Sequence, residues 1–302
     1  MRKLAIAVVS LALVTAACSS PGDEEVATVD GTVLTVADIS RLFTTEAIPI
    51  DDGFRLAAFR LVALDVLERA YIEDFDGTID PAAVEEVYQG FLLDLATQGV
   101  GIEQAVGIAN AGEEMIEFDA RLTVIRDDVV DQLVTAPDLV EALQGTIEAD
   151  PAQLSTVCAR HILVETEVAA QEVIGRLDAG EDFAAVADEV SLDASPGGDL
   201  GCSSPTLYVG PFATATMTGE IGEITGPVET TFGFHVLIVD DRVTPTADEI
   251  AADPAAHLSS DQVQSLWVDW INGELDQADI TVNEKFGVWN EATLRIDPPP
   301  TG

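Results

Sequence analysis

Positively charged residues are scarce in this 302-residue chain. The sequence holds 13 lysine and arginine residues against 55 aspartate and glutamate residues, which gives a formal net charge of −42. Such a chain is repelled by the phosphates of DNA and RNA, and no basic patch interrupts the acidic sequence. Nucleic acid is therefore excluded as a partner, and the acidic side chains are expected to solvate the surface.

Two further absences narrow the class of protein. No segment has the Asp/Asn/Gly spacing of a calcium-binding loop, so we predict no calcium site. We expect no other metal site and no cofactor. The apolar run Leu4–Ala17 is too short to cross a bilayer, because a transmembrane helix needs about 20 residues. The hydrophobic fraction of 47% is nevertheless large enough to build a real core.

Residues 1–17 have the features of an export signal. A basic start is followed by the apolar run, and small residues precede Cys18. The segment Val14–Cys18 resembles a bacterial lipobox, with Thr15 in place of the usual leucine. We therefore expect lipid on Cys18, a polar tether over 18–25, and a location outside the cytoplasm at the cell membrane. Ordinary signal cleavage beside an incidental cysteine is the alternative.

The densest set of motifs lies between residues 158 and 242. Short β-branched runs there favour strands, and two stretches with apolar residues at helical spacing favour short helices. A strand, then helices, then strands predicts a small α+β domain. The motifs are CARHILV at 158–164, GEDF at 180–183, SLDAS at 191–195, GGDLG at 197–201, YVGPF at 208–212, GEITGPV at 222–228 and TTFGFHVLIV at 230–239.

These motifs, in this order, resemble the parvulin-type peptidyl-prolyl cis–trans isomerases. The resemblance implies an antiparallel sheet flanked by helices, with His161 and His235 on neighbouring central strands. It implies that Thr230 completes their hydrogen-bond network and that Asp193 lies beside the reacting carbonyl. The residues expected to bind the substrate proline are Leu200, Tyr208, Phe212 and Phe232, with Tyr208 where the family commonly has methionine. Without the resemblance, the two histidines would be interpreted as ordinary core residues.

The implied chemistry is compatible with these residue types. Rotation about an X–Pro bond faces a barrier of roughly 20 kcal/mol but breaks no bond, so Asp193 is not needed as a nucleophile. A dry pocket favours the twisted amide, which is less polar than the planar one. Phosphate-directed parvulins carry Lys and Arg after the first strand, where this chain has Glu165 and Glu167. We therefore expect unphosphorylated X–Pro substrates.

The sequence also predicts a disulfide bond between Cys158 and Cys202. Cys158 would begin the first strand, and Cys202 would lie on the strand that neighbours it in the parvulin fold. An exported protein permits such a bond. Two free buried thiols are the alternative.

The flanking segments favour a second, mainly helical lobe. We predict a helical domain over 26–150, the isomerase domain over 152–243, and a C-terminal helix and strand over 244–302 that pack on the first domain. The expected elements are a hairpin at 26–35, helices near 52–74, 81–98, 113–134, 138–148 and 260–277, and a strand at 278–282.

This pattern resembles extracytoplasmic foldases of the PrsA and SurA type, whose helical part binds unfolded exported proteins. Two functions follow. The first is a lipid-anchored prolyl isomerase and foldase for exported proteins with X–Pro bonds. The second is a chaperone whose parvulin domain has little activity, which Tyr208 leaves open. The helices could also be only a scaffold for the isomerase.

Overall fold

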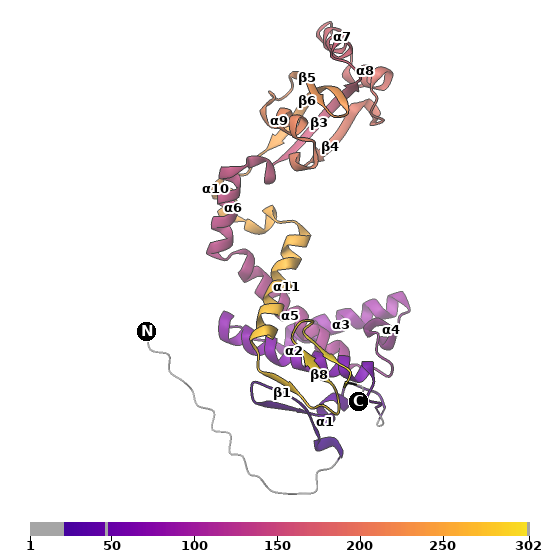
Figure 1. Ribbon diagram of the computed structural model, residues 1–302, viewed down its shortest axis with the longest axis vertical. Helices are drawn as coiled ribbons and strands as arrows, with labels where there is room; N and C mark the ends of the chain where they lie inside the picture. Colours follow the sequence, from indigo (N-terminus) through magenta and orange to yellow (C-terminus); the bar gives the residue numbers. More distant parts are fainter. Residues whose placement is uncertain (1–20, 46–47, 301–302) are drawn as a thin grey trace, which may run out of the picture. The chain divides into compact units, whose positions relative to one another are not determined.

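The computed structural model describes residues 21–45 and 48–300, so the predicted leader and Cys18 lie outside the described residues (Figure 1). The chain is α+β and divides into two compact units. Unit 1 combines the residues up to Val130 with those from Ser265 onward, and unit 2 is Asp131–Gln264. No helix among the described residues has both the length and the apolar character to cross a bilayer.

Unit 1 is built from both ends of the chain. Its elements are the 3₁₀ turn η1 (Pro21–Asp23), β1 (Glu25–Val29), β2 (Thr32–Thr35), α1 (Val36–Ser40), α2 (Asp52–Phe75), α3 (Pro81–Gln98), α4 (Ile102–Val106), most of α5 (Glu114–Val134) and of α11 (Ser260–Gln277), β7 (Ile280–Val282), β8 (Val288–Asn290) and β9 (Arg295–Asp297). Strand β7 pairs antiparallel with β1, giving the order β2–β1–β7. The strand predicted at 278–282 is therefore present, and it lies beside the N-terminal hairpin.

Local capping explains where the helices of unit 1 begin. Thr35 and Asp38 form a capping box at the start of α1. Asp51 caps α2, and Asp80 caps α3, whose first residue is Pro81. Each cap satisfies a backbone N–H that would otherwise lack a partner in the first turn.

The buried face of α2 agrees in part with the one that the large apolar residues predict. The spacing of Leu61, Leu64, Leu67 and Tyr71 predicts the apolar face; Leu67 and Tyr71 are buried, whereas Leu61 and Leu64 are only partly buried. The buried stripe also includes small residues such as Ala57, Ala58 and Ala70, which let other segments approach closely. The large apolar residues alone therefore identify only part of the buried stripe.

Helix α11 contributes its apolar face to unit 1. Trp267 and Leu275 are buried, and Trp270 meets Phe75 edge-on with ring centroids 5.8 Å apart. Ile271 packs against the hydrophobic core of unit 1, which contains Phe54 and Leu275. The burial of these large side chains explains why the C-terminal segment belongs to the same unit as the N-terminal helices.

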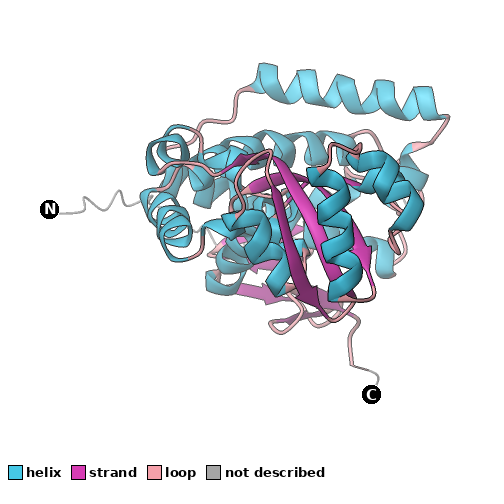
Figure 2. Cartoon of the chain, turned by 90° about the horizontal axis from the view of Figure 1, so that it is seen from above, coloured by secondary structure: helices cyan, strands magenta, loops and turns pink. Residues whose placement is uncertain are grey.

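Unit 2 contains one four-stranded antiparallel sheet in the order β4–β3–β6–β5 (Figure 1; strands in magenta in Figure 2). Its elements are α6 (Pro137–Ala149), β3 (Thr156–Val164), α7 (Glu167–Asp178), α8 (Phe183–Val190), β4 (Asp199–Ser203), α9 (Gly210–Thr218), β5 (Ile224–Thr230), β6 (Gly233–Val243) and α10 (Ala247–Ala252), with short 3₁₀ turns η2 (Pro151–Gln153), η3 (Pro196–Gly198), η4 (Pro205–Leu207) and η5 (Pro254–His257) between them.

Side chains alternate between the two faces of the central strands. Ile162 on β3 and Val236 on β6 pack against α7 and α8. Leu237 packs against Phe212 of α9, and His161 and His235 also contact that ring. Because successive residues of a strand point to opposite faces, the two histidines lie on the α9 side of the sheet.

The division into units differs from the predicted boundaries at residues 150 and 244. Helix α6 was assigned to the N-terminal domain, and α10 to the C-terminal segment. In the structure Leu143 and Ile147 of α6 pack with Ile250 of α10. Gln144 Nε2 also donates a hydrogen bond to the Ala247 carbonyl, at 3.0 Å. The two helices therefore pair with each other and belong to unit 2.

Candidate functional site

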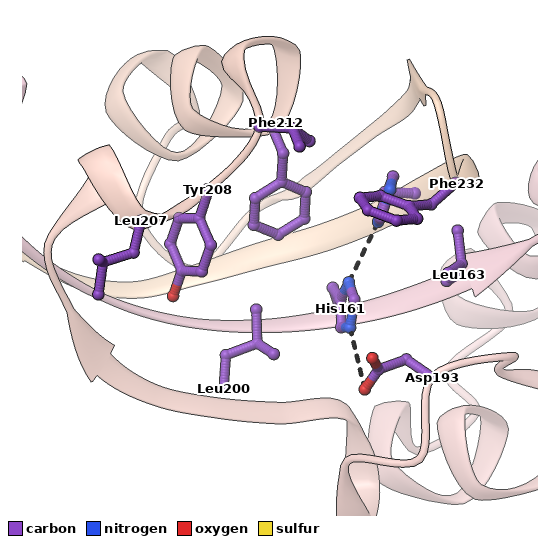
Figure 3. A pocket seen from close by; sticks show the side chains of 10 residues that line it. His161, Leu163, Asp193, Leu200, Leu207, Tyr208, Phe212 and Phe232 are labelled. Atoms are coloured by element: carbon purple, nitrogen blue, oxygen red, sulfur yellow. Dashed lines mark hydrogen bonds and ion pairs between the residues drawn. The ribbon is translucent and has the colours of Figure 1, made fainter.

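A hollow of about 390 Å³ opens on the α9 side of the sheet (Figure 3). The residues that line it are His161, Leu163, Asp193, Leu200, Leu207, Tyr208, Val209, Phe212, Phe232 and His235. The structure thus brings together seven of the eight pocket residues expected from the sequence. The eighth, Thr230, does not line the hollow, but its hydroxyl contacts the Nε2 atom of His235.

The two histidines are neighbours because of the register between β3 and β6. His161 lies opposite Leu237, and Leu163 lies opposite His235, so the imidazoles are diagonal neighbours on one face. Their Nδ1 atoms are 3.1 Å apart, and their rings stack with centroids 5.3 Å apart. Both side chains are buried, with 6% and 5% exposure. One hydrogen must lie between the two Nδ1 atoms.

Polar groups contact the imidazole pair at both of its ends. Thr230 Oγ1 is 2.8 Å from His235 Nε2 and also accepts the N–H of Phe232. At the other end, His161 Nε2 lies 3.4 Å from Asp193 Oδ1 (Figure 3). This distance is longer than an ordinary hydrogen bond, and no closer partner satisfies the buried Nε2.

The surroundings favour one arrangement of hydrogens. If His235 donates from Nδ1, His161 carries its hydrogen on Nε2, facing the carboxylate of Asp193. His235 Nε2 then accepts the Thr230 hydroxyl. The opposite arrangement of two neutral rings would point the lone pair of His161 Nε2 at the carboxylate, which is repulsive.

The electrostatics of the hollow are set by burial and by local hydrogen bonds. Burial, together with the neighbouring His161, lowers the pKa of His235 to about 4, so this imidazole is neutral at pH 7. Hydrogen bonds from Ser195, one of them from its backbone N–H at 2.9 Å, lower the pKa of Asp193. Asp193 is therefore ionised, and it lies beside an imidazole pair whose His235 member is neutral.

Aromatic rings form the opposite wall. Phe212 meets His161 and His235 edge-on, with centroid distances of 5.5 and 5.0 Å. Tyr208 meets Phe212 edge-on at 5.1 Å. The Tyr208 hydroxyl is 2.7 Å from Ser203 Oγ, so its polar end has a partner on β4. Because its hydroxyl has this partner, Tyr208 presents mainly the surface of its ring to the hollow. Parvulins commonly have methionine at the corresponding position.

Two glycines allow loops to pass close to β3. Gly198 and Gly233 have positive φ angles of 73° and 136°. A Cβ at Gly198 would overlap the carbonyl oxygen of His161, and one at Gly233 would overlap that of Val164. These close approaches hold the loop before β4 and the β5–β6 turn against the strand that carries His161.

A disulfide lies next to the site. Cys158 and Cys202 are opposite one another on β3 and β4, and their sulfur atoms are bonded. The bond ties Leu200, on β4, to the strand that carries His161. No cluster of three or more His, Cys, Asp or Glu side chains within 21–45 and 48–300 is arranged to hold a metal ion.

Sequence reasoning missed three lining residues. Leu163 could have been found by strand alternation, because it lies two residues after His161 and shares its face. Leu207 ends the short turn η4, and Val209 immediately precedes α9, so neither belongs to a periodic pattern long enough to indicate which side chains point inward.

Comparison with known proteins identifies the domain in which this hollow lies. A family model described as "Rotamase: PPIC-type PPIASE domain" matches residues 160–241. The foldase protein PrsA of Halalkalibacterium halodurans is 31% identical over 225 residues, with 63% of each chain covered. PrsA of Geobacillus kaustophilus is 34% identical over 150 residues, covering 48% of this chain and 51% of its own. The chain thus matches less than two thirds of the length of these relatives.

Among solved structures, a peptidylprolyl isomerase (PrsA) from Bacillus cereus is similar over 88% of this chain and 96% of its own. The sequence identity is 20% and the TM-score is 0.41.

Proposed function

We propose that this protein is a peptidyl-prolyl cis–trans isomerase and foldase, on the premise that residues 160–241 form a PpiC-type rotamase domain in a chain similar to PrsA foldases. The observation that carries the proposal is the arrangement within the hollow. A buried imidazole pair lies between an aromatic wall and an ionised carboxylate. The substrates are unphosphorylated X–Pro bonds.

The geometry suggests how the barrier is lowered. The proline ring would lie against Leu200, Tyr208 and Phe212, where water is excluded. In a planar amide, resonance places negative charge on the carbonyl oxygen, and twisting the bond removes that charge. An ionised Asp193 near this oxygen therefore disfavours the planar form more than the twisted one. The imidazole pair keeps the floor of the pocket ordered, and no covalent step is required.

The foldase role extends to unfolded exported proteins as clients. Unit 1 has two adjoining hollows of about 280 and 530 Å³ that share Glu117 and Arg121. Such a groove, with Leu42, Leu61 and Phe118 in one half, supports binding of an extended polypeptide. The leader and Cys18 support a lipid-anchored, extracytoplasmic location. A chaperone with a weakly active parvulin domain is the alternative.

A matched pair of variants tests the isomerase role. Phe212 and Phe183 are both buried phenylalanines near the start of a helix of unit 2, but only Phe212 lines the hollow. Phe212→Leu should lower the acceleration of proline-limited refolding about tenfold, which corresponds to ~1.4 kcal/mol in the barrier. Phe183→Leu should perturb folding similarly and keep the activity. Equal effects of the two changes would argue against this pocket.

A further inference from the structure

We propose that the site selects X–Pro bonds in which X is lysine or arginine, and that Asp193 is the residue that determines this preference. The inference rests on the proposed isomerase function and deepens it by naming the substrate class. Two observations support it. The first is the distribution of charged side chains in unit 2, and the second is the position of Asp193 relative to the apolar end of the hollow.

Unit 2 offers no uncommitted cation. Residues 131–264 contain 24 aspartate and glutamate residues, three arginines and no lysine. Arg160 is paired with Asp240 through two hydrogen bonds of 2.9 and 2.6 Å. Arg176 is paired with two glutamates, and Arg242 donates to the carbonyls of Thr216 and Gly219. An acidic or phosphorylated residue at X would thus find no counter-charge.

Asp193 is a carboxylate without a cationic partner. Its side chain is 37% exposed, and its one ion-pair contact is with His161, at 3.4 Å. It is the one aspartate or glutamate among the residues that line the hollow, and no lysine or arginine lines it. A cation from the substrate would therefore meet an exposed, uncompensated negative charge.

The position of Asp193 relative to the proline pocket indicates which substrate residue it meets. Figure 3 shows Leu200, Tyr208 and Phe212 toward one end of the hollow, and Asp193 beside His161 toward the other. With the proline ring at the first end, the rotating bond lies over the imidazoles and residue X lies at the second.

The same end of the hollow offers apolar surface for the stem of a long basic side chain. Leu163 and Phe232 line it there, and Phe232 is 65% exposed. Lysine and arginine can lay their methylene groups along such surface while the charged head stays in water. An exposed aromatic face also attracts a cation. The carboxylate and the ring therefore favour the same kind of side chain.

The size of the preference for a basic X depends on an exposed ion pair between the substrate side chain and Asp193. Such pairs are weak, and the acidic surroundings add a longer-range contribution that salt screens. We expect kcat/KM for Lys–Pro to exceed that for Glu–Pro about tenfold at low salt, with a neutral X of the same length between them. At an ionic strength of about 1 M, where the Debye length is ~3 Å, the ratio should fall to about threefold or less.

The test uses the full chain and three peptides that differ only at X, which is lysine, norleucine or glutamate. Exchange NMR gives kcat/KM for each peptide with wild type, Asp193→Asn and Asp188→Asn. Asp188 is the matched control because it also accepts a backbone N–H, from Gly197 at 2.7 Å, but does not line the hollow. Using the Lys/Glu ratio cancels any loss of activity common to all peptides.

The predicted result is a ratio near ten for wild type and Asp188→Asn, and a ratio of about three or less for Asp193→Asn. A wild-type ratio near one, with all peptides accelerated, would overturn the preference and leave the isomerase function intact. A ratio that is unchanged in Asp193→Asn would overturn the role of this residue. If no peptide is accelerated, the proposed function itself fails, and the preference fails with it.

Discussion

The imidazoles of His161 and His235 share one hydrogen between their Nδ1 atoms, which lie 3.1 Å apart in a buried site. Burial, together with the neighbouring His161, lowers the pKa of His235 to about 4. The imidazole of His235 therefore stays neutral over the physiological range.

We predict that His235 remains neutral in the folded protein down to about pH 5. In the unfolded chain it binds a proton below its ordinary pKa of 6.5, whereas in the folded protein it does so only near 4. Acidification from pH 6.5 to 4 thus favours unfolding, by at most about 3 kcal/mol from this residue. NMR titration of the imidazole Cε1–H signals measures the midpoint. A His235 midpoint near 6.5 would contradict the buried network.

At the scale of single residues, the sequence motifs predicted which side chains lie close together but not how they are oriented. Alternation along the strands and the family resemblance predicted that His161, His235 and Phe212 are neighbours. The contribution of Tyr208 could not be predicted, because it depends on the contact between its hydroxyl and Ser203. That contact arises from the path of the chain between β4 and α9, which no periodic pattern describes.

Of the four strands in the sheet of unit 2, β4 pairs with its neighbours at the fewest positions. It is an edge strand, it pairs with β3 at only three positions, and its register shifts between Cys158 and Arg160. It also contains no buried residue. The disulfide to Cys158 is therefore a main attachment of the strand that carries Leu200.

Replacing both Cys158 and Cys202 by alanine should lower the free energy of unfolding of unit 2. The bond joins residues 44 positions apart, and chain-entropy arguments give roughly 4 kcal/mol for a loop of this size. Denaturant unfolding of the wild type and the double variant measures the difference. A reductant should destabilise the wild type and leave the double variant unchanged. Equal stability of the two proteins under oxidising conditions would refute a stabilising bond.

Helix α9 shows why some elements escaped prediction. Its sequence, GPFATATMT, contains glycine, proline and three threonines, all of which have low helix propensity. Pro211 in the first turn and the burial of Phe212 and Ala215 against the sheet stabilise it instead. The helices at 52–75 and 81–98 were predictable because their caps and apolar spacing lie within the helices themselves.

At the scale of the whole molecule, unit 1 is closed by pairing between residues that are far apart in sequence. Val282 lies opposite Ala27, and Leu275 is buried in the core that holds Phe54. The apolar face of α11 made this association predictable, because such a face needs a partner. The assignment of α6 and α10 to unit 2 was not predictable, because it depends on a small contact between two short helices.

Catalysis of X–Pro rotation is the central claim, and exchange NMR on wild-type protein tests it most directly. The measurement uses an unphosphorylated peptide with one X–Pro bond and a micromolar concentration of the purified chain. Unaided isomerisation takes tens of seconds, so cis–trans cross-peaks are absent at a mixing time of about one second. The account predicts that the protein makes these cross-peaks appear. If they stay absent, with the protein shown to be folded, the isomerase assignment is contradicted.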